Sequence, residues 1–161
     1  MPNGTATKLH WFNCASAEPV TVTDVQILDG SGKPNYPIDI SKPIVVQASA
    51  INNGDVYNKL LVDVKLSYWG DVIGTTCHFT SIPTFGLLNN LDGCAVSKNC
   101  PVAKGPISFK QQIDLSPYSS IISQLGGGVV YQIDLHVKNG DTSQHEELAC
   151  GSAQGLMANK Q

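Results

Sequence analysis

The residues in this chain with the greatest capacity for chemistry are five cysteines and four histidines, among 161 residues in all. Cys94 and Cys100 are six positions apart. This spacing does not match the CxxC of zinc or redox sites, and it is typical of a small disulfide-closed loop. Cys14 and Cys150 lie near the two ends of the chain, so a bond between them would tie the ends together. In the chain-entropy model the long closure stabilises by ~5 kcal/mol and the short one by ~2 kcal/mol.

Cys77 is the cysteine left over. We expect a buried thiol that packs as a small hydrophobic side chain, with an intermolecular or alternative disulfide as the other possibility. His78 follows it directly, but neighbouring residues on a strand point to opposite faces and cannot pair as nucleophile and base. The remaining histidines, His10, His136 and His145, show no metal-ligand spacing, and we expect His136 to be solvated on an outward face.

Motifs for catalysis and for nucleic-acid binding are missing from the sequence. There is no GxSxG nucleophile elbow, and the stretch 30–33, which resembles a phosphate loop, is followed by Pro34 where serine or threonine is required. All ten basic residues are lysines and the net charge is −3. We therefore predict a protein that is not an enzyme, holds no cofactor and no metal, and has no nucleic-acid partner.

The sequence also bears on the compartment. The polar start, residues 1–11, has no apolar signal core, and no stretch reaches the roughly 18 apolar residues of a membrane span. Asn3 begins an Asn-Gly-Thr glycosylation sequon. Together with the disulfides, these features lead us to expect a secreted or lysosomal protein whose signal peptide is not part of this sequence.

Alternation of apolar and polar residues predicts that β-strands position these groups. The pattern is clearest over 59–69, and the strands that we expect cover 19–28, 43–51, 59–69, 107–115, 129–137 and 146–157. Only 119–125 looks helical. We predict an all-β sandwich of two antiparallel sheets with seven or eight strands. It forms a single domain over 8–157, with flexible tails at 1–7 and 158–161.

The segment 79–91 does not fit the usual pattern of polar loops. It carries Ile82, Phe85, Leu87 and Leu88 between Pro, Gly and Asn residues. An apolar loop of this length requires a partner, which can be its own core, a ligand or a membrane surface.

Two short runs resemble a known family. Asp92-Gly93-Cys94, five further residues and then Cys100-Pro101-Val102 resemble the ML lipid-recognition family, and the similarity covers about 8–157. The positions of Cys14, before the first strand, and Cys150, in the last strand, agree with this resemblance. Within the family the nearer likeness is to the Niemann–Pick type C sterol carrier and the more distant one to the ganglioside activator. The resemblance implies an immunoglobulin-like sandwich, a Cys14–Cys150 disulfide and a lipid cavity between the sheets.

The function implied by this resemblance is lipid binding and transfer. The ligand would be a sterol, a fatty acid or a phospholipid acyl chain, and the 82–91 loop would touch a membrane transiently. The position that corresponds to a pocket-lining aromatic of the sterol carrier is Gly86, and the neighbouring Phe85 is the candidate for this role. The alternative is a protein-interaction or lipid-presenting co-factor, and any protein acceptor is unknown. The candidate lipid-binding residues are Phe85, Ile82, Leu87, Leu88, Val62, Val64, Leu66, Ile107, Phe109, Ile113, Leu115, Tyr118, Tyr131, Ile133 and Leu135.

Overall fold

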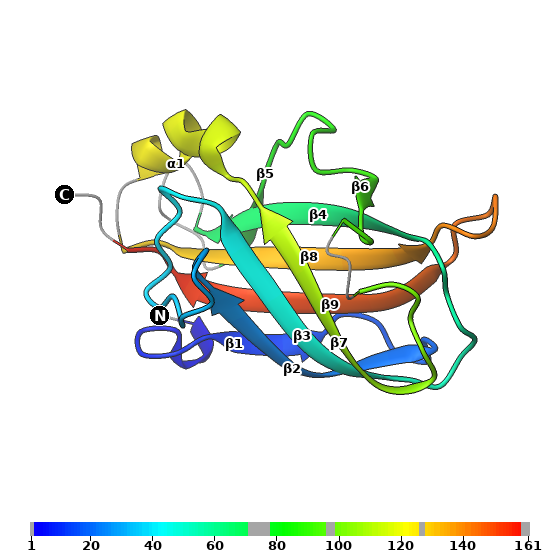
Figure 1. Cartoon of the computed structure of the whole chain (residues 1–161). Coiled ribbons are helices and arrows are strands. Elements are labelled where there is room, and N and C mark those ends of the chain that lie inside the picture. The colour runs from blue at the N-terminus through cyan, green and yellow to red at the C-terminus, as the bar shows by residue number, and fades with distance from the viewer. Residues whose placement is uncertain (1, 71–77, 96–98, 126–127, 159–161) are drawn as a thin grey trace.

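Two antiparallel β-sheets packed face to face make up the computed structural model of this chain, which describes residues 2–70, 78–95, 99–125 and 128–158 (Figure 1). The strands are β1 (His10–Asn13), β2 (Val20–Leu28), β3 (Ile44–Asn52), β4 (Leu60–Trp69), β5 (Phe79–Ile82), β6 (Leu91–Asp92), β7 (Gly105–Ile113), β8 (Val130–Asn139) and β9 (Glu147–Leu156). The short helical segments are η1 (Pro2–Gly4), η2 (Ser116–Tyr118) and α1 (Ser119–Leu125).

The larger sheet has the strand order β1-β9-β8-β4-β5, with β6 also paired to β4, and the smaller sheet has the order β2-β3-β7. Figure 1 shows the smaller sheet crossing the larger one obliquely, with the β8–β9 hairpin at the end opposite α1. The prediction of an all-β sandwich of two antiparallel sheets is therefore confirmed.

The core lies between the sheets because apolar side chains alternate along each strand. On β4 the inward-facing Val62, Val64 and Leu66 are at most 2% exposed, whereas Asp63 and Lys65 lie on the other face. Each fully buried side chain of this kind contributes ~1.5–3 kcal/mol relative to an exposed one. This alternation fixes the register, since a shift of one residue would turn every apolar side chain outward.

The sequence does not predict β1, β5 and β6, so the described part of the chain has nine strands where seven or eight were expected. These three strands have four, four and two residues. Such short segments carry too few alternating positions to give a pattern. They are strands because β9 and β4 offer them backbone groups to pair with.

Residues near the N-terminus, in the segment where we expect a flexible tail, contact the sandwich. Thr5 is fully buried, and the Tyr36 hydroxyl donates a hydrogen bond to its carbonyl oxygen. Asn3 Nδ2 donates to Gln154 Oε1 over 2.7 Å. At the other end, the Ala158 amide donates to the Ile38 carbonyl over 2.9 Å, so residue 158 is held as well. Residues 159–161 lie outside the described part of the chain.

Two disulfides close the loops that the cysteine spacing indicated. Cys14 bonds to Cys150 and Cys94 bonds to Cys100, with Cα–Cα distances of 5.1 and 5.4 Å. The first bond ties the end of β1 to β9, beside the backbone hydrogen bond from Cys14 N–H to the Cys150 carbonyl. Cys77 lies outside the described residues. Among the described residues, no helix has the length and apolar character that crossing a membrane requires.

Candidate functional site

The space between the sheets contains two adjoining apolar cavities, of about 60 and about 40 Å³. Both lie mainly between the smaller sheet and strands β8 and β9. The larger cavity extends to the end of the sandwich where Tyr57, Leu60 and Val102 form a second buried cluster. The residues that line both cavities are Val22, Ala48, Phe109, Val137 and Ala149.

Small residues on β3 and β9 create these cavities. The inner positions that border the cavities on these two strands include Ala48, Ala50, Ala149, Gly151 and Ala153. A methyl group or a hydrogen atom leaves the facing sheet without a packing partner, whereas the valines and leucine of β4 fill the interior. Since protein cores otherwise pack as densely as organic crystals, such a gap is a local property of these strands.

The cavity walls offer almost no polar group. The polar lining residues are Asn99, Ser108 and Ser152. Asn99 is already saturated, because its Nδ2 donates to the carbonyls of Gly93 and Lys110 over 2.9 and 2.6 Å. Its Oδ1 accepts the Lys110 amide over 2.9 Å. No charged side chain lines either cavity in the part of the chain described, so a bound group must be apolar where it touches these walls.

The cavities are too small to hold a lipid without a change in the packing of the sheets. A cavity of about 150 Å³ is what benzene occupies in a protein core. The strands of the two sheets are not paired with each other in the described ranges. Separation of the sheets would break no ladder of backbone hydrogen bonds, but between β1 and β2 it would break the two hydrogen bonds, each of 3.0 Å, that the Asn13 side chain forms with the backbone of Val22.

An open groove of about 550 Å³, mostly apolar but also lined by Asp92 and Asp114, lies between the 87–92 segment and the end of β7. Its walls include Leu87, Leu88, Ile113 and Tyr118. The Tyr118 hydroxyl donates to the Thr84 carbonyl over 2.8 Å and so holds the apolar loop beside η2. Leu88 is 6% exposed and packs into the core, which gives this loop the partner that its sequence requires.

Phe85 lies on the surface, at the tip of the same loop. Its side chain is 78% exposed and Leu87 is 59% exposed. Phe85 and Gly86 both have positive φ values, of 54° and 75°. A bulky residue in this region is uncommon, and the turn holds the ring away from the loop. The expectation that Phe85 lines the pocket therefore differs from the structure, in which it borders neither cavity.

The remaining predicted site residues divide into three groups. Those in the cavity walls are Ile107, Phe109, Ile133 and Leu135. Those in the groove are Leu87, Leu88, Ile113 and Tyr118. Those packed in the core, away from the cavities and the groove, are Ile82, Val62, Val64, Leu66, Leu115 and Tyr131.

Sequence reasoning missed many cavity residues, and it missed the alanines and the glycine among them because it selected large apolar side chains. The missed ones are Val20, Val22, Val25, Val46, Ala48, Ala50, Tyr57, Leu60, Val102, Val137, Leu148, Ala149, Gly151 and Ala153. The signal that could have found them is the recurrence of alanine and glycine at every second position of β9, since small inward residues are what leaves a gap.

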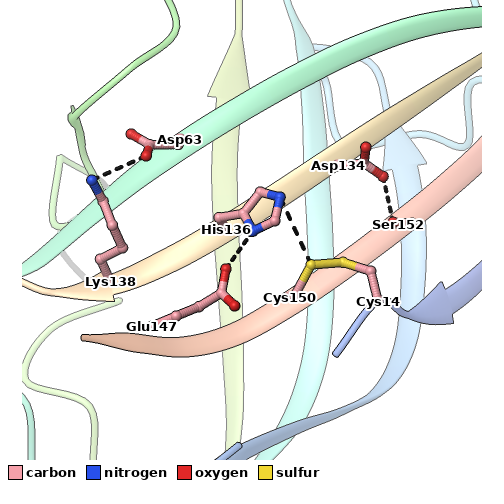
Figure 2. A network of polar contacts seen from close by, with 8 residues as sticks. All are labelled: Cys14, Asp63, Asp134, His136, Lys138, Glu147, Cys150 and Ser152. Carbon is pink, nitrogen blue, oxygen red and sulfur yellow. Dashed lines mark hydrogen bonds and ion pairs between the residues drawn. A yellow bond between two sulfur atoms is a disulfide. The ribbon is translucent and has the colours of Figure 1, made fainter. Parts of the chain in front are cut away.

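A polar network covers the outer face of the larger sheet (Figure 2). Lys138 Nζ forms an ion pair with Asp63 Oδ2 over 3.0 Å, and His136 Nδ1 pairs with Glu147. Burial raises the pKa of Asp63, but the Asn90 amide and Lys138 outweigh this effect and hold the pKa below its usual value. His136 lies on the outward face as expected, but it is less solvated than expected, because its side chain is 26% exposed and paired with a carboxylate.

Glu18 joins this network from the loop before β2. The pKa of Glu18 is raised to about 7, mainly by burial and also by the charge of Glu147 and a hydrogen bond to it, while His136 acts in the opposite direction. The Oε1 atom of Glu18 is buried without a partner among the described residues. Glu18 therefore keeps its proton to higher pH than an ordinary glutamate.

The same network contains the set of side chains closest to a metal-binding arrangement in the described ranges. The donor atoms of His136, Glu147 and Cys150 all lie within 4.8 Å of one another. Cys150 is bonded to Cys14, however, and a disulfide sulfur lacks the thiolate charge that binds zinc. This group therefore supplies no reason to revise the prediction of a protein without a metal.

This two-sheet sandwich, with apolar space between its inner faces, is a lipid-binding fold, as the following family match shows. The chain belongs to the ML domain family, because the model of that family matches residues 8–154. A crystal structure of a Niemann–Pick type C2 protein from the Japanese carpenter ant is similar in fold, with a TM-score of 0.52 and 17% identity over 92% of this chain and 98% of that one.

The C-terminal domain of Wzt is also similar, with a TM-score of 0.46 and 9% identity over 96% of this chain and 80% of that one, and no inference rests on it. None of the curated proteins matches this sequence significantly. The expected resemblance to the ML family is thus confirmed by a match that covers most of the chain.

Proposed function

We propose that this protein is a lipid carrier that holds the apolar part of a sterol, a fatty acid or a phospholipid between its two sheets. The observation that carries the proposal is the set of small inward residues on β3 and β9, which leaves apolar space where larger side chains would interlock. Each methylene removed from water contributes ~0.8 kcal/mol, so a long chain binds without charged contacts. Entry of the ligand enlarges this space by moving the sheets apart.

The loop that carries Phe85 and Leu87 is the surface that meets the membrane in this proposal. Both side chains are largely exposed, and an apolar pair at the tip of a loop loses contact with water when it enters the lipid boundary. The groove beside Leu88 and Tyr118 then provides an apolar path from this loop toward the sandwich.

The carrier acts without catalysis and outside the cytosol in this proposal. Two disulfides support an oxidising compartment, since such bonds persist in secreted and lysosomal proteins. The cavity walls support a binding role, because the described residues that form them include no charged group, no nucleophile with a base, and little polar surface.

The test is to express the protein in a secretory host, extract the purified protein with organic solvent and identify what is released by mass spectrometry. The proposal expects a lipid in a ratio close to one per protein, and displacement of a fluorescent fatty acid or sterol by the same lipid. Protein that releases no lipid and binds neither fluorescent probe would contradict the proposal and favour a protein-interaction role.

A further inference from the structure

The hydroxyl group of Tyr131 is buried and has no hydrogen-bond partner among the described residues. Tyr131 is 1% exposed. A buried donor without an acceptor is destabilising, and such groups in native proteins require an explanation, of which an absent ligand is one. By contrast, the hydroxyls of Tyr36, Tyr57 and Tyr118 each form a hydrogen bond with a backbone group. Tyr131 therefore has an unused donor inside the sandwich.

Tyr131 begins the inward-facing row of β8 residues whose next members border the cavities, and Tyr131 itself lines neither cavity. Ile133, Leu135 and Val137 occupy the following alternate positions on the same inner face and line the smaller cavity. Alternate residues of a strand are about 6.8 Å apart, so the row from Tyr131 to Val137 extends over about 20 Å. A lipid chain that follows this row has one end beside Tyr131 and the other in the larger cavity, which Val137 also lines.

We propose that Tyr131 donates a hydrogen bond to the head group of the bound lipid, and that this lipid is an uncharged, single-chain molecule with a hydroxyl group, such as a long-chain alcohol. The inference rests on the proposed function and narrows its ligand class. A narrow row of residues accommodates one chain more readily than a ring system, because the cavities along it are small.

The absence of charge in the lining favours a neutral head. No lysine lines either cavity in the described part of the chain, so a buried phosphate or carboxylate would lack a compensating charge. A hydroxyl can accept the Tyr131 hydrogen bond at no such cost. Burial raises the pKa of Tyr131 to about 12, with the charge of Tyr68 as a second cause, so the phenol remains protonated at physiological pH.

The experiment compares two ligands of the same chain length, dodecanol and dodecane, by displacement of a fluorescent probe from the purified, delipidated protein. The variants are Tyr131→Phe and, as a matched control, Tyr68→Phe. Tyr68 lies directly opposite Tyr131 on β4, and its hydroxyl is not one of the buried groups that lack a partner among the described residues. In the Tyr131→Phe protein we expect the affinity for dodecanol relative to dodecane to fall about fivefold to tenfold, the effect of one neutral hydrogen bond.

The absolute affinity for dodecane should be unchanged or higher in Tyr131→Phe, because the unpaired hydroxyl is gone, and the melting temperature should not fall. The assignment to Tyr131 would be overturned if the affinity for dodecanol relative to dodecane did not change in Tyr131→Phe. It would also be overturned if this relative affinity fell equally in Tyr68→Phe. If the wild-type protein binds neither the probe nor dodecane, the proposed function itself fails and this inference falls with it. Binding of both ligands with an unchanged ratio leaves the carrier function intact and refutes only the head-group contact.

Discussion

Filling the larger cavity should stabilise the protein and weaken lipid binding at the same time. Ala149 borders both cavities from β9, and valine at this position adds two methyl-sized groups to the strand. The cavity volume is about 60 Å³, and removal of a cavity is worth roughly 24 cal/mol per Å³, which sets an upper limit of ~1.4 kcal/mol. At about 2–4 °C per kcal/mol for a chain of this size, the melting temperature should rise by up to ~6 °C.

The assay measures thermal unfolding of the delipidated Ala149→Val protein and its affinity for a fluorescent fatty acid. The control is Ala103→Val, which adds the same atoms at an exposed position. We expect the melting temperature of Ala149→Val to rise and its affinity for the probe to fall at least tenfold, with neither change in the control. A variant that unfolds at lower temperature and binds the probe normally would show that the cavity is not the binding site.

Three further predictions concern the surface, the disulfide and the polar network. Phe85→Ser should slow lipid transfer between vesicles several-fold and leave the melting temperature within about 1 °C, because the ring is 78% exposed; equal losses of transfer and stability would indicate a core role. Replacing Cys14 and Cys150 together by serine should reduce the free energy of unfolding by ~5 kcal/mol in the chain-entropy model, since the closure spans 136 residues; unchanged denaturant unfolding would contradict this. The pKa of Glu18, about 7 in the folded state and 4.5 in the reference state, means that its contribution to stability is present below pH 4.5 and is lost as the pH rises toward 7. Between pH 5 and pH 7.5 the melting temperature of the wild-type protein should therefore fall more than that of Glu18→Gln. If the two melting temperatures changed equally with pH, the raised pKa of Glu18 would be refuted.

The sandwich could be predicted from the sequence because its long strands alternate. Val62, Val64 and Leu66 on β4 occur at every second position, and this alternation alone requires a half-buried strand. The Cys94–Cys100 disulfide could be anticipated from its spacing, and the Cys14–Cys150 disulfide from the resemblance to the ML family. The burial of Thr5 could not be predicted, because it depends on a contact with Tyr36, which is distant in the sequence.

The candidate site was harder to predict than the fold. We selected large apolar residues as candidate ligand contacts. The space between the sheets, however, exists where the inward residues, such as Ala48 and Gly151, are small. The exposure of Phe85 depends on a left-handed turn at a non-glycine residue, which no local pattern indicates. The Tyr131 hydroxyl is unpaired because no described residue of the neighbouring strands places a hydrogen-bonding group near it. The sequence does not show which groups the fold brings together, so this feature could not be predicted.

The central claim is that the lipid chain lies between the sheets, along β3 and β9. It can be tested by NMR of protein with isotope-labelled alanine and leucine methyl groups, titrated with a fatty acid that carries a nitroxide on its chain. The account predicts strong broadening of the Ala48, Ala149 and Ala153 methyl signals, with the exposed Ala103 unaffected. Broadening confined to Leu87 and the other groove residues, with the three inner alanines unchanged, would contradict it.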